Sequence, residues 1–433
     1  MNKIIRNALA SGVALALAGC AIVAPRLQVP QQAAPVAASI NTQPAQVAEP
    51  KPNGATWKPE LFLAWPKGYT SGPVAYDMTT GAQQFALPAG RADALGKLYF
   101  GALLGSDETT IKTYTLHDGH GVGTLTLKGQ WGVVGVSANG LWVAVARMPS
   151  ADEWVAWTKQ RKWQTDVQVI DTNNNQVKHT LKLDGNFEVE TISNDGQSLF
   201  LLEHLPAANA NPHNDAYNVR LFNLWTERMN EYPLRQKGSD EVMAGYAHDV
   251  VASTDGEWLM TLYLNSTKKE AFIHALLLNY QFPVCIDLPS GDGDVKVLRE
   301  YRLRMSADNK RLYAANAALG VVVEIGLDDS TYPPYQVLHI ASFDAVKLEA
   351  GTRSLYTHSA WSVDGKTLYF TSADRTWAYD TAARKVTGLA VTGDLNGIGT
   401  SSDGQRVIVA RENAVVVLDA VSGTMLNFPV AAR

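Results

Sequence analysis

Three side chains of different charge stand at one equivalent position of a repeated sequence pattern. Asp249, Arg302 and His358 each lie four residues before a serine that opens a short turn, and His248 adjoins the first of them. A carboxylate, a guanidinium group and an imidazole together can bind an anion, a small polar ligand or a peptide terminus. Equivalent positions on equivalent strands face the same way, so we expect these residues to gather at one opening. The alternative is a structural role, in which they bridge neighbouring repeats around water.

A second candidate site is an aromatic and basic segment at residues 149–165, PSADEWVAWTKQRKWQT. It contains Trp154, Trp157 and Trp163 beside Arg161. Exposed Trp and Arg side chains are frequent at the centres of binding surfaces. The alternative is a short amphipathic helix, because Trp154 and Trp157 are three residues apart and would pack on one helix face.

The turns that follow the first set of residues recur six times along the chain. Their serines are Ser137, Ser193, Ser253, Ser306, Ser362 and Ser401, spaced 39 to 60 residues apart. Most continue as Ser-x-Asp-Gly or Ser-x-Asn-Gly, and an alternating apolar run such as LWVAVAR or TLYFTS comes next. Asp-Gly and Asn-Gly supply the positive φ angles of a tight hairpin, so each repeat predicts two antiparallel strands.

A second turn pattern falls between the serine turns. An apolar strand ends in an aspartate and a polar turn at Asp77, Asp171, Asp380 and Asp419. Two hairpins per repeat give four strands, which is one blade of a β-propeller. Such blades must close into a ring, because open four-stranded units would expose their edges.

The expected fold is therefore all-β, a single propeller over residues 58–433. Residues 61–63 and 95–100 look like the second strands of two further repeats. We expect seven blades, the commoner closure, while the eight second-strand candidates leave eight open. An array of β-sandwiches is the alternative fold.

These two turn motifs resemble those of bacterial YVTN and WD-type propellers. The similarity covers roughly residues 58–430 and rests on S-x-D-G followed by L-[YFW]-[VA], together with D-x-x-[TS]-G. It implies the propeller fold. It implies little about function, because the motif residues make turns and pack strands.

The long segments of the chain are expected on one face of the ring. Turns between first and second strands, and between third and fourth strands, are short throughout. The longer pieces fall in second-to-third turns or between blades, at residues 149–165, 206–218, 235–246, 265–271 and 342–355. Binding residues concentrate on loops held by a rigid scaffold, so we expect this elaborated face to carry the function.

The first residues are typical of an exported protein. Lys3 and Arg6 precede an apolar run at residues 8–18, which is too short to span a membrane. The run ends in Leu-Ala-Gly before Cys20, a sequence that resembles the lipobox of bacterial lipoproteins. The resemblance implies that residues 1–19 are a signal peptide and that the Cys20 sulfur carries a lipid anchor.

The lipid anchor implies a place in the cell envelope. Residues 20–57 are rich in Pro, Ala and Gln and form the expected flexible linker. Ala21, not Asp, follows Cys20. The resemblance to bacterial lipoproteins then implies the outer membrane over the inner membrane.

Composition narrows the function further. The 433 residues carry 37 basic and 42 acidic side chains, a net charge of −5, which argues against nucleic-acid binding. The second cysteine, Cys285, lies in an apolar run and is interpreted as a small core residue, with a reactive thiol as the alternative.

No spacing of residues in the sequence predicts a metal site, a cofactor or a catalytic motif.

The function expected from these features is that of a monomeric, non-catalytic module. It would bind a protein or an envelope component through its elaborated face. The alternative is an enzyme, lactonase-like or quinone-dependent dehydrogenase-like, with its site at the mouth of the central channel.

Overall fold

The computed structural model describes residues 61–64, 72–77, 82–153, 155, 163–205, 216–236, 242–348, 358–393, 395–401, 403–411 and 414–426. The chain divides into two units, Met1–Ala55 and Thr56–Arg433, and every described residue belongs to the second. The signal peptide, Cys20 and the linker of the sequence analysis lie outside the described residues. So do three residues of the aromatic segment, Trp154, Trp157 and Arg161.

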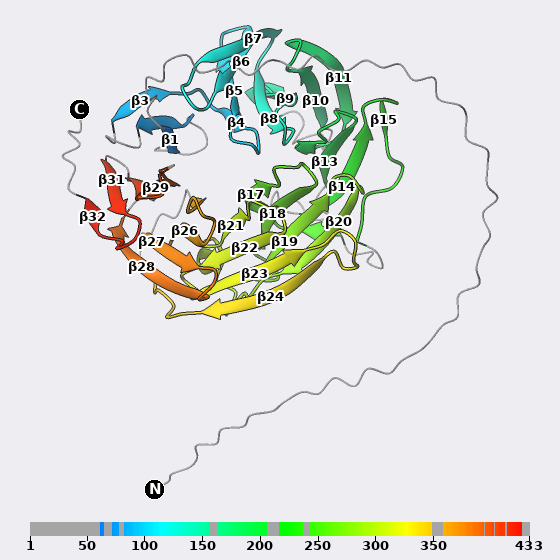
Figure 1. Ribbon diagram of the computed structural model, residues 1–433. Coiled ribbons are helices and arrows are strands. Elements are labelled where there is room, and N and C mark those ends of the chain that lie inside the picture. Colours follow the sequence, from blue (N-terminus) through cyan, green and yellow to red (C-terminus); the bar gives the residue numbers. More distant parts are fainter. Residues whose placement is uncertain are drawn as a thin grey trace, which may run out of the picture. The chain divides into compact units, whose positions relative to one another are not determined.

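Eight antiparallel sheets follow one another around a ring, which identifies the fold as an eight-bladed β-propeller (Figure 1). Within a blade each strand pairs with the next along the chain. The first four blades comprise β1 (Leu61–Ala64), β2 (Val74–Asp77) and β3 (Gln83–Ala86); β4 (Gly90–Ala92), β5 (Leu98–Leu104), β6 (Glu108–Thr115) and β7 (Gly121–Lys128); β8 (Trp131–Val136), β9 (Trp142–Arg147), β10 (Gln164–Asp171) and β11 (Gln176–Asp184); and β12 (Phe187–Ile192), β13 (Ser198–His204), β14 (Ala216–Asn223) and β15 (Arg228–Met229), with β16 (Met243–Ala244) paired to β14.

The other four blades repeat the same order. They comprise β17 (Tyr246–Ala252), β18 (Trp258–Asn265), β19 (Glu270–Leu277) and β20 (Phe282–Asp287); β21 (Arg302–Met305), β22 (Arg311–Asn316), β23 (Val321–Leu327) and β24 (Tyr335–Ser342); β25 (Ser359–Trp361), β26 (Thr367–Ser372), β27 (Arg375–Asp380) and β28 (Lys385–Thr392); and β29 (Leu395–Thr400), β30 (Arg406–Arg411), β31 (Ala414–Asp419) and β32 (Met425–Leu426). One short helix, α2 (Val295–Leu298), precedes blade 6.

The propeller has eight blades. The expectation of seven blades is therefore wrong, and the alternative of eight blades is confirmed. Residues 61–63 and 95–100 contribute strands to two separate sheets, blades 1 and 2. Blade 1 has three strands among the described residues. Its Phe62 and Ala64 pack against Ile408 and Ala410 of blade 8, so the first and last blades meet (Figure 1).

The serine turns owe their form to the side chains that recur in them. In the turn between β25 and β26, the Ser362 hydroxyl donates to Asp364 Oδ1 at 2.7 Å and accepts from the Thr367 amide at 2.9 Å. Gly365 closes the turn at φ 68°, a left-handed angle that glycine adopts without strain. The motif therefore closes the hairpin with side-chain hydrogen bonds, which confirms its assignment to the first-to-second strand turn.

The two ends of the strands differ as expected, with two corrections. The connection from β23, which ends at Leu327, to β24, which begins at Tyr335, is longer than the short turns expected between third and fourth strands. Residues 265–271 are not a long segment, because β18 ends at Asn265 and β19 begins at Glu270. The Asn265 side chain closes this short turn by accepting from the Thr267 and Lys268 amides at 3.1 and 2.9 Å. A long connection that the sequence analysis missed runs from β20 to β21 and holds α2.

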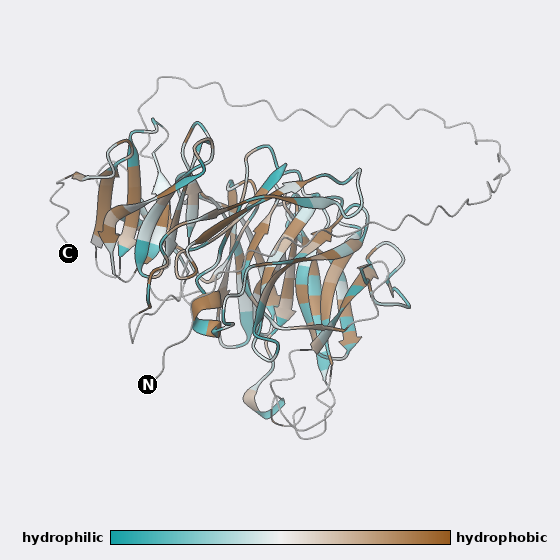
Figure 2. Cartoon of the chain, turned by 90° about the horizontal axis from the view of Figure 1, so that it is seen from below, coloured by the Kyte–Doolittle hydropathy of each residue, from teal (hydrophilic) through white to brown (hydrophobic). Residues whose placement is uncertain are grey.

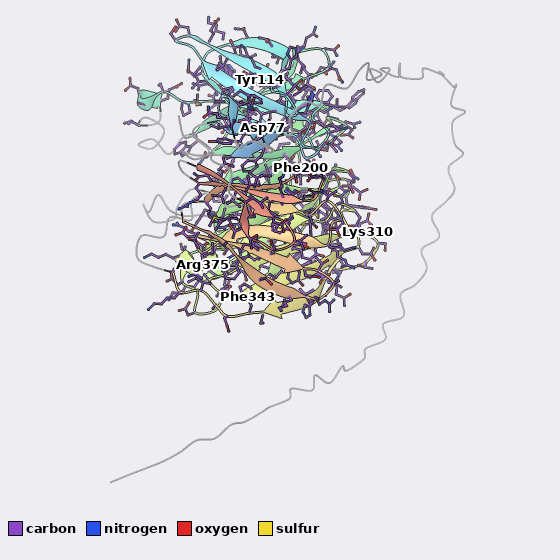
Figure 3. All side chains as sticks on the ribbon, turned by 60° about the vertical axis from the view of Figure 1, so that its left-hand side comes forward. Asp77, Tyr114, Phe200, Lys310, Phe343 and Arg375 are labelled. Carbon is purple, nitrogen blue, oxygen red and sulfur yellow. The ribbon has the colours of Figure 1, made fainter. Side chains whose placement is uncertain are left out.

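The core lies between the blades. Apolar strands stand side by side (Figure 2). Side chains of neighbouring sheets, drawn as sticks in Figure 3, form shared buried clusters. Phe200 of blade 4 is one of these and is fully buried (Figure 3). First strands of neighbouring blades lie against one another and surround the ring centre. Among the described residues, no helix has the length and apolar character needed to cross a bilayer.

Candidate functional site

The residues predicted to cluster at the ring centre lie on three successive blades. Asp249 and His248 are in β17, Arg302 begins β21, and His358 directly precedes β25. Asp249 Oδ2 accepts a hydrogen bond from the Leu303 amide at 2.8 Å, which joins blade 5 to blade 6. This bond brings Asp249 against the strand that begins with Arg302.

Arg302 is engaged by protein groups on all sides. The residue is 1% exposed, and its Nε donates to the Thr371 carbonyl of blade 7 at 2.9 Å. Its Nη1 donates to the Arg299 carbonyl at 2.7 Å, and its Nη2 lies 3.4 Å from Glu300 Oε2. The guanidinium group thus ties blades 6 and 7 together.

The ionisation of the cluster follows from burial and from its arginines. Burial raises the pKa of Asp249, and the Leu303 amide and the charge of Arg302 oppose this rise. Burial and the positive charges of Arg302 and Arg304 lower the pKa of His358 to about 4. Burial and Arg302 also lower the pKa of His248 to about 4. Both imidazoles are therefore neutral at pH 7.

Arg304 belongs to this cluster and was missed by the sequence analysis. Burial lowers its pKa, and the charge of Asp249 opposes the shift. It stands two residues after Arg302 and hence on the same face of β21, a spacing that could have identified it. The same inner strands are joined by the Ser359 hydroxyl, which donates to the Leu303 carbonyl at 3.1 Å. The ring centre is a network that connects blades 5, 6 and 7.

The aromatic segment is described only at its ends. Residues 151–153 and 155 are helical, and Trp163 is half-buried beside β10. Arg147 of β9 holds the segment, because it pairs with Glu153 at 2.9 Å and with Asp166 at 2.7 Å. The hydrogen bond from Arg147 lowers the pKa of Glu153 to about 2.

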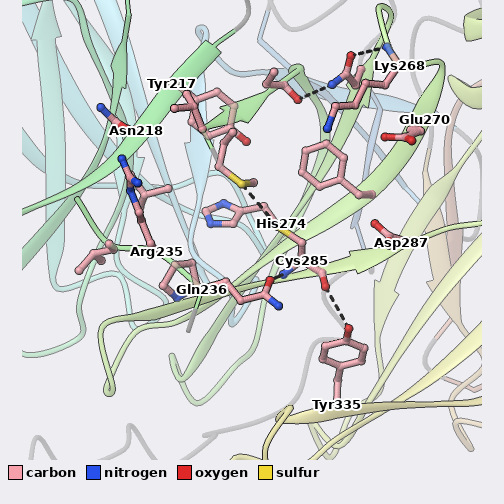
Figure 4. Close-up of a pocket in the computed structure, with 18 residues that line it drawn as sticks. Tyr217, Asn218, Arg235, Gln236, Lys268, Glu270, His274, Cys285, Asp287 and Tyr335 are labelled. Carbon is pink, nitrogen blue, oxygen red and sulfur yellow. Dashed lines mark hydrogen bonds between the residues drawn. The ribbon is translucent and has the colours of Figure 1, made fainter. Parts of the chain in front are cut away.

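A pocket of about 350 Å³ lies between blades 4 and 5 (Figure 4). Tyr217 of β14 and residues 234–236 and 242–244 border it on the blade 4 side. His274, Cys285 and the turn at Lys268 border it on the blade 5 side. These segments belong to the face that carries the longer connections, so the pocket is walled by elements of the elaborated face.

A row of buried polar groups leads into this pocket. Glu190 of β12 lies with its Oε1 3.4 Å from Thr261 Oγ1 and 3.3 Å from His274 Nδ1. The His274 and Glu190 side chains are 0% and 5% exposed. Glu190 Oε2 and His274 Nε2 have no hydrogen-bond partner among the described residues. Buried polar atoms are normally paired, so these two are available to a water molecule or a ligand.

Two sulfur atoms lie farther out in the same pocket. The Cys285 thiol is 3.6 Å from Met243 Sδ, and both residues are half-buried (Figure 4). The Cys285 amide donates to Gln236 Oε1 at 3.1 Å, and its carbonyl accepts from the Tyr335 hydroxyl at 3.1 Å. The outer edge of β20 is therefore fixed by neighbours from blades 4 and 6. The placement of Cys285 on a pocket wall differs from the core position expected from its apolar neighbours in sequence.

Two aromatic rings of the pocket lining, Tyr217 and Phe272, belong to a stack with Tyr263. Tyr217 stacks on Tyr263 with ring centroids 5.0 Å apart, and Tyr263 stacks on Phe272 at 5.6 Å. Burial, together with the nearby charge of Glu190, raises the pKa of Tyr217 and Tyr263 well above the usual value. Both phenols therefore stay protonated and can donate hydrogen bonds.

Comparisons with known proteins do not identify a family. No protein-family model matches the chain. No curated protein sequence matches it either.

Solved structures are similar to the chain at low sequence identity. AztD from Citrobacter koseri has a TM-score of 0.49 and 12% identity, over 85% of this chain and 93% of that one. Dihydro-heme d1 dehydrogenase NirN has a TM-score of 0.48 and 13% identity, over 89% of this chain and 76% of that one. A putative 6-phosphogluconolactonase from Bacteroides fragilis has a TM-score of 0.41 and 15% identity, over 77% of this chain and 93% of that one. These proteins differ widely in kind, and at such values we draw no functional conclusion from them.

Proposed function

We propose that this chain is a lipid-anchored cell-envelope propeller that binds a partner through its elaborated face, without catalysing a reaction. The anchor is the lipid on Cys20, and the linker up to residue 57 holds the propeller away from the membrane. The partner is a protein or another component of the envelope, and the outer membrane is the proposed location.

The observation that carries this proposal is the asymmetry of the two faces. The serine turns on one face are closed by their own side chains, as at Ser362 and Asp364. The opposite face carries the longer connections, and the pocket between blades 4 and 5 is walled by them. A concave site bordered by loops on a rigid scaffold is where a propeller of this shape would take a partner.

Site-directed photocrosslinking in intact cells tests the face. A photoreactive amino acid replaces Lys268, an exposed residue beside the pocket, or Lys366, an exposed residue in a serine turn. We expect a discrete crosslinked product from position 268 and none from position 366. Equal products from both positions, or none from either, would contradict the assignment of the face.

The anchor is tested separately by Cys20→Ser. We expect the variant to leave the membrane fraction and the unaltered chain to remain there. Mass spectrometry of the N-terminal peptide should show acyl groups on the unaltered chain. A peptide without acyl groups would overturn the anchor and leave the test of the face unaffected.

A further inference from the structure

We propose that the pocket between blades 4 and 5 binds a soft monovalent metal ion, Cu(I), through Cys285 Sγ, Met243 Sδ and His274 Nε2. This inference is independent of the partner proposed above. It rests on the two sulfur atoms, on the available imidazole nitrogen and on the carboxylate behind that imidazole.

The two sulfur atoms have the spacing of ligands to one ion. Cys285 Sγ and Met243 Sδ are 3.6 Å apart. A metal ion binds thiolate sulfur at about 2.3 Å, as zinc does, so both atoms can reach an ion placed between them. Thiolate and thioether are soft ligands that select Cu(I), whereas hard cations prefer oxygen.

His274 supplies the third ligand from the adjacent strand. The Leu288 amide donates to the Ala271 carbonyl, and Phe272 pairs with Asp287, Ile273 with Ile286 and His274 with Cys285. Since bonded and non-bonded pairs alternate along an antiparallel ladder, His274 and Cys285 form a non-hydrogen-bonded pair. Side chains are closest in such pairs, with Cβ atoms about 4.5–5.5 Å apart. The imidazole therefore lies next to the thiol on the pocket wall.

Glu190 fixes the imidazole in the form that a metal needs. His274 Nδ1 lies 3.3 Å from Glu190 Oε1, so the Nδ1–H donates to the carboxylate and Nε2 keeps its lone pair. Nε2 is buried and has no hydrogen-bond partner among the described residues. Histidines that ligate metals commonly donate their other N–H to a carboxylate in this way.

The pocket gives the Cu(I) ion a route to its ligands, and binding releases one proton. Cys285 and Met243 are both half-buried and line the pocket. Binding replaces the thiol proton of Cys285 by Cu(I), and the proton leaves to solvent. The resulting thiolate–Cu(I) unit is neutral, with one sulfur and one nitrogen completing the coordination.

The ligand set also separates Cu(I) from Zn²⁺. Within the described part of the chain, no group of three His, Cys, Asp or Glu side chains is placed to hold a metal ion. Zinc sites use four ligands drawn from those residue types and water, and thioether sulfur is not among them. A site of two such residues and one thioether is therefore expected to prefer the softer ion.

Competition for Cu(I) against a chromophoric chelator, without oxygen, tests the proposal. The full chain carries Cys20→Ser, which leaves Cys285 as its one cysteine. We expect one Cu(I) per chain, and X-ray absorption with two sulfur ligands and one nitrogen ligand. Absence of Cu(I) transfer from the chelator, a sulfur-free coordination shell or tighter retention of Zn²⁺ than of Cu(I) would overturn the proposal.

Matched variants distinguish a site from a packing contact. Met243→Leu should remove one sulfur ligand from the X-ray absorption spectrum, and Cys285→Ser should abolish Cu(I) transfer. Glu190→Gln should weaken Cu(I) affinity by roughly 10–100-fold, because it loosens the hold on His274. Met425→Leu, at an exposed residue of β32, should bind as the parent does. Unchanged affinity in the folded Cys285→Ser variant, with folding checked by its thermal transition, would contradict the site.

Discussion

The two faces of blade 5 make different contacts although they come from the same strands. Alternate residues of β18 and β19, among them Met260, Leu262 and Ile273, join blade 6 in one continuous cluster of 19 buried residues. The residues between them face blade 4, where Thr261 and His274 meet Glu190. Two smaller apolar clusters lie on either side of that polar row.

The difference between the two interfaces of blade 5 indicates which of them stabilises the fold and which is suited to binding. An apolar interface gains free energy from burial, at about 25 cal/mol per Å² of apolar surface. A buried polar pair such as Glu190 and His274 seldom adds net stability, because the cost of desolvation offsets its attraction. We therefore assign the blade 5–6 interface to holding the ring together and the blade 4–5 interface to a binding role.

Truncating the apolar interface should have the largest effect. Leu262→Ala removes most of a fully buried side chain, so we expect the free energy of unfolding to fall by roughly 2–5 kcal/mol. Urea denaturation measures this change. Thr261→Ala, on the opposite face of the same strand, is the matched control and should cost about 1 kcal/mol or less. Equal losses in the two variants would remove the distinction between the interfaces.

The ring centre should make stability depend on pH. The pKa of His358 is about 4 in the folded protein against 6.5 for the free group, so the unfolded chain takes up the proton first on acidification. Stability is therefore full above about pH 6.5 and falls towards pH 4, by up to about 3 kcal/mol. Thermal unfolding of the unaltered chain and of His358→Gln over this range checks the slope. A variant with the same slope as the unaltered chain would show that His358 is not responsible.

The polar row should behave as a coupled pair. Glu190→Leu or His274→Leu alone leaves a buried partner without its hydrogen bond, so each should cost roughly 1–3 kcal/mol. The double replacement should recover most of that loss, since an apolar pair of similar volume is often neutral or stabilising. A double-mutant cycle in urea measures the coupling. Additive losses would mean that the two side chains do not act together.

The smallest effect is expected at the aromatic segment. The pKa of Glu153 is about 2 because Arg147 donates to its carboxylate, against 4.5 for the free group. The Arg147–Glu153 pair therefore stabilises the folded segment above about pH 4.5, and this stabilisation is lost as the pH falls towards 2. Fluorescence of the tryptophans in residues 149–165 should change over that range, and Glu153→Gln should remove the change. An identical titration in the variant would place the transition elsewhere.

The fold was predictable because its signals are local. The serine turns depend on side chains within five residues of one another, as at Ser362 and Thr367, and such spacing is visible in any sequence. The same register predicted that Asp249, Arg302 and His358 would stand at equivalent inner positions. The predicted roles of these residues and of Trp163 in binding stay predictions.

The pocket was not predictable from the same patterns. His274 lies in the run Ala271-Phe272-Ile273-His274-Ala275, which resembles a buried strand, and its neighbours Glu190 and Cys285 are 84 and 11 residues away. Only the packing of blade 4 on blade 5 shows that the odd polar residues of two apolar strands meet. A histidine and a glutamate inside apolar strands were the available signal.

The asparagines of the serine turns tie one rim of the ring from blade to blade. Asn194 donates to the Asp255 carbonyl at 2.9 Å between blades 4 and 5, and Asn309 accepts from the Thr254 amide at 3.1 Å between blades 5 and 6. A rim tied in this way acts as a hinge line. Any separation of blades 4 and 5 must then be widest at the opposite rim. An occupant of the pocket there would push these two blades apart and so change the shape of the ring.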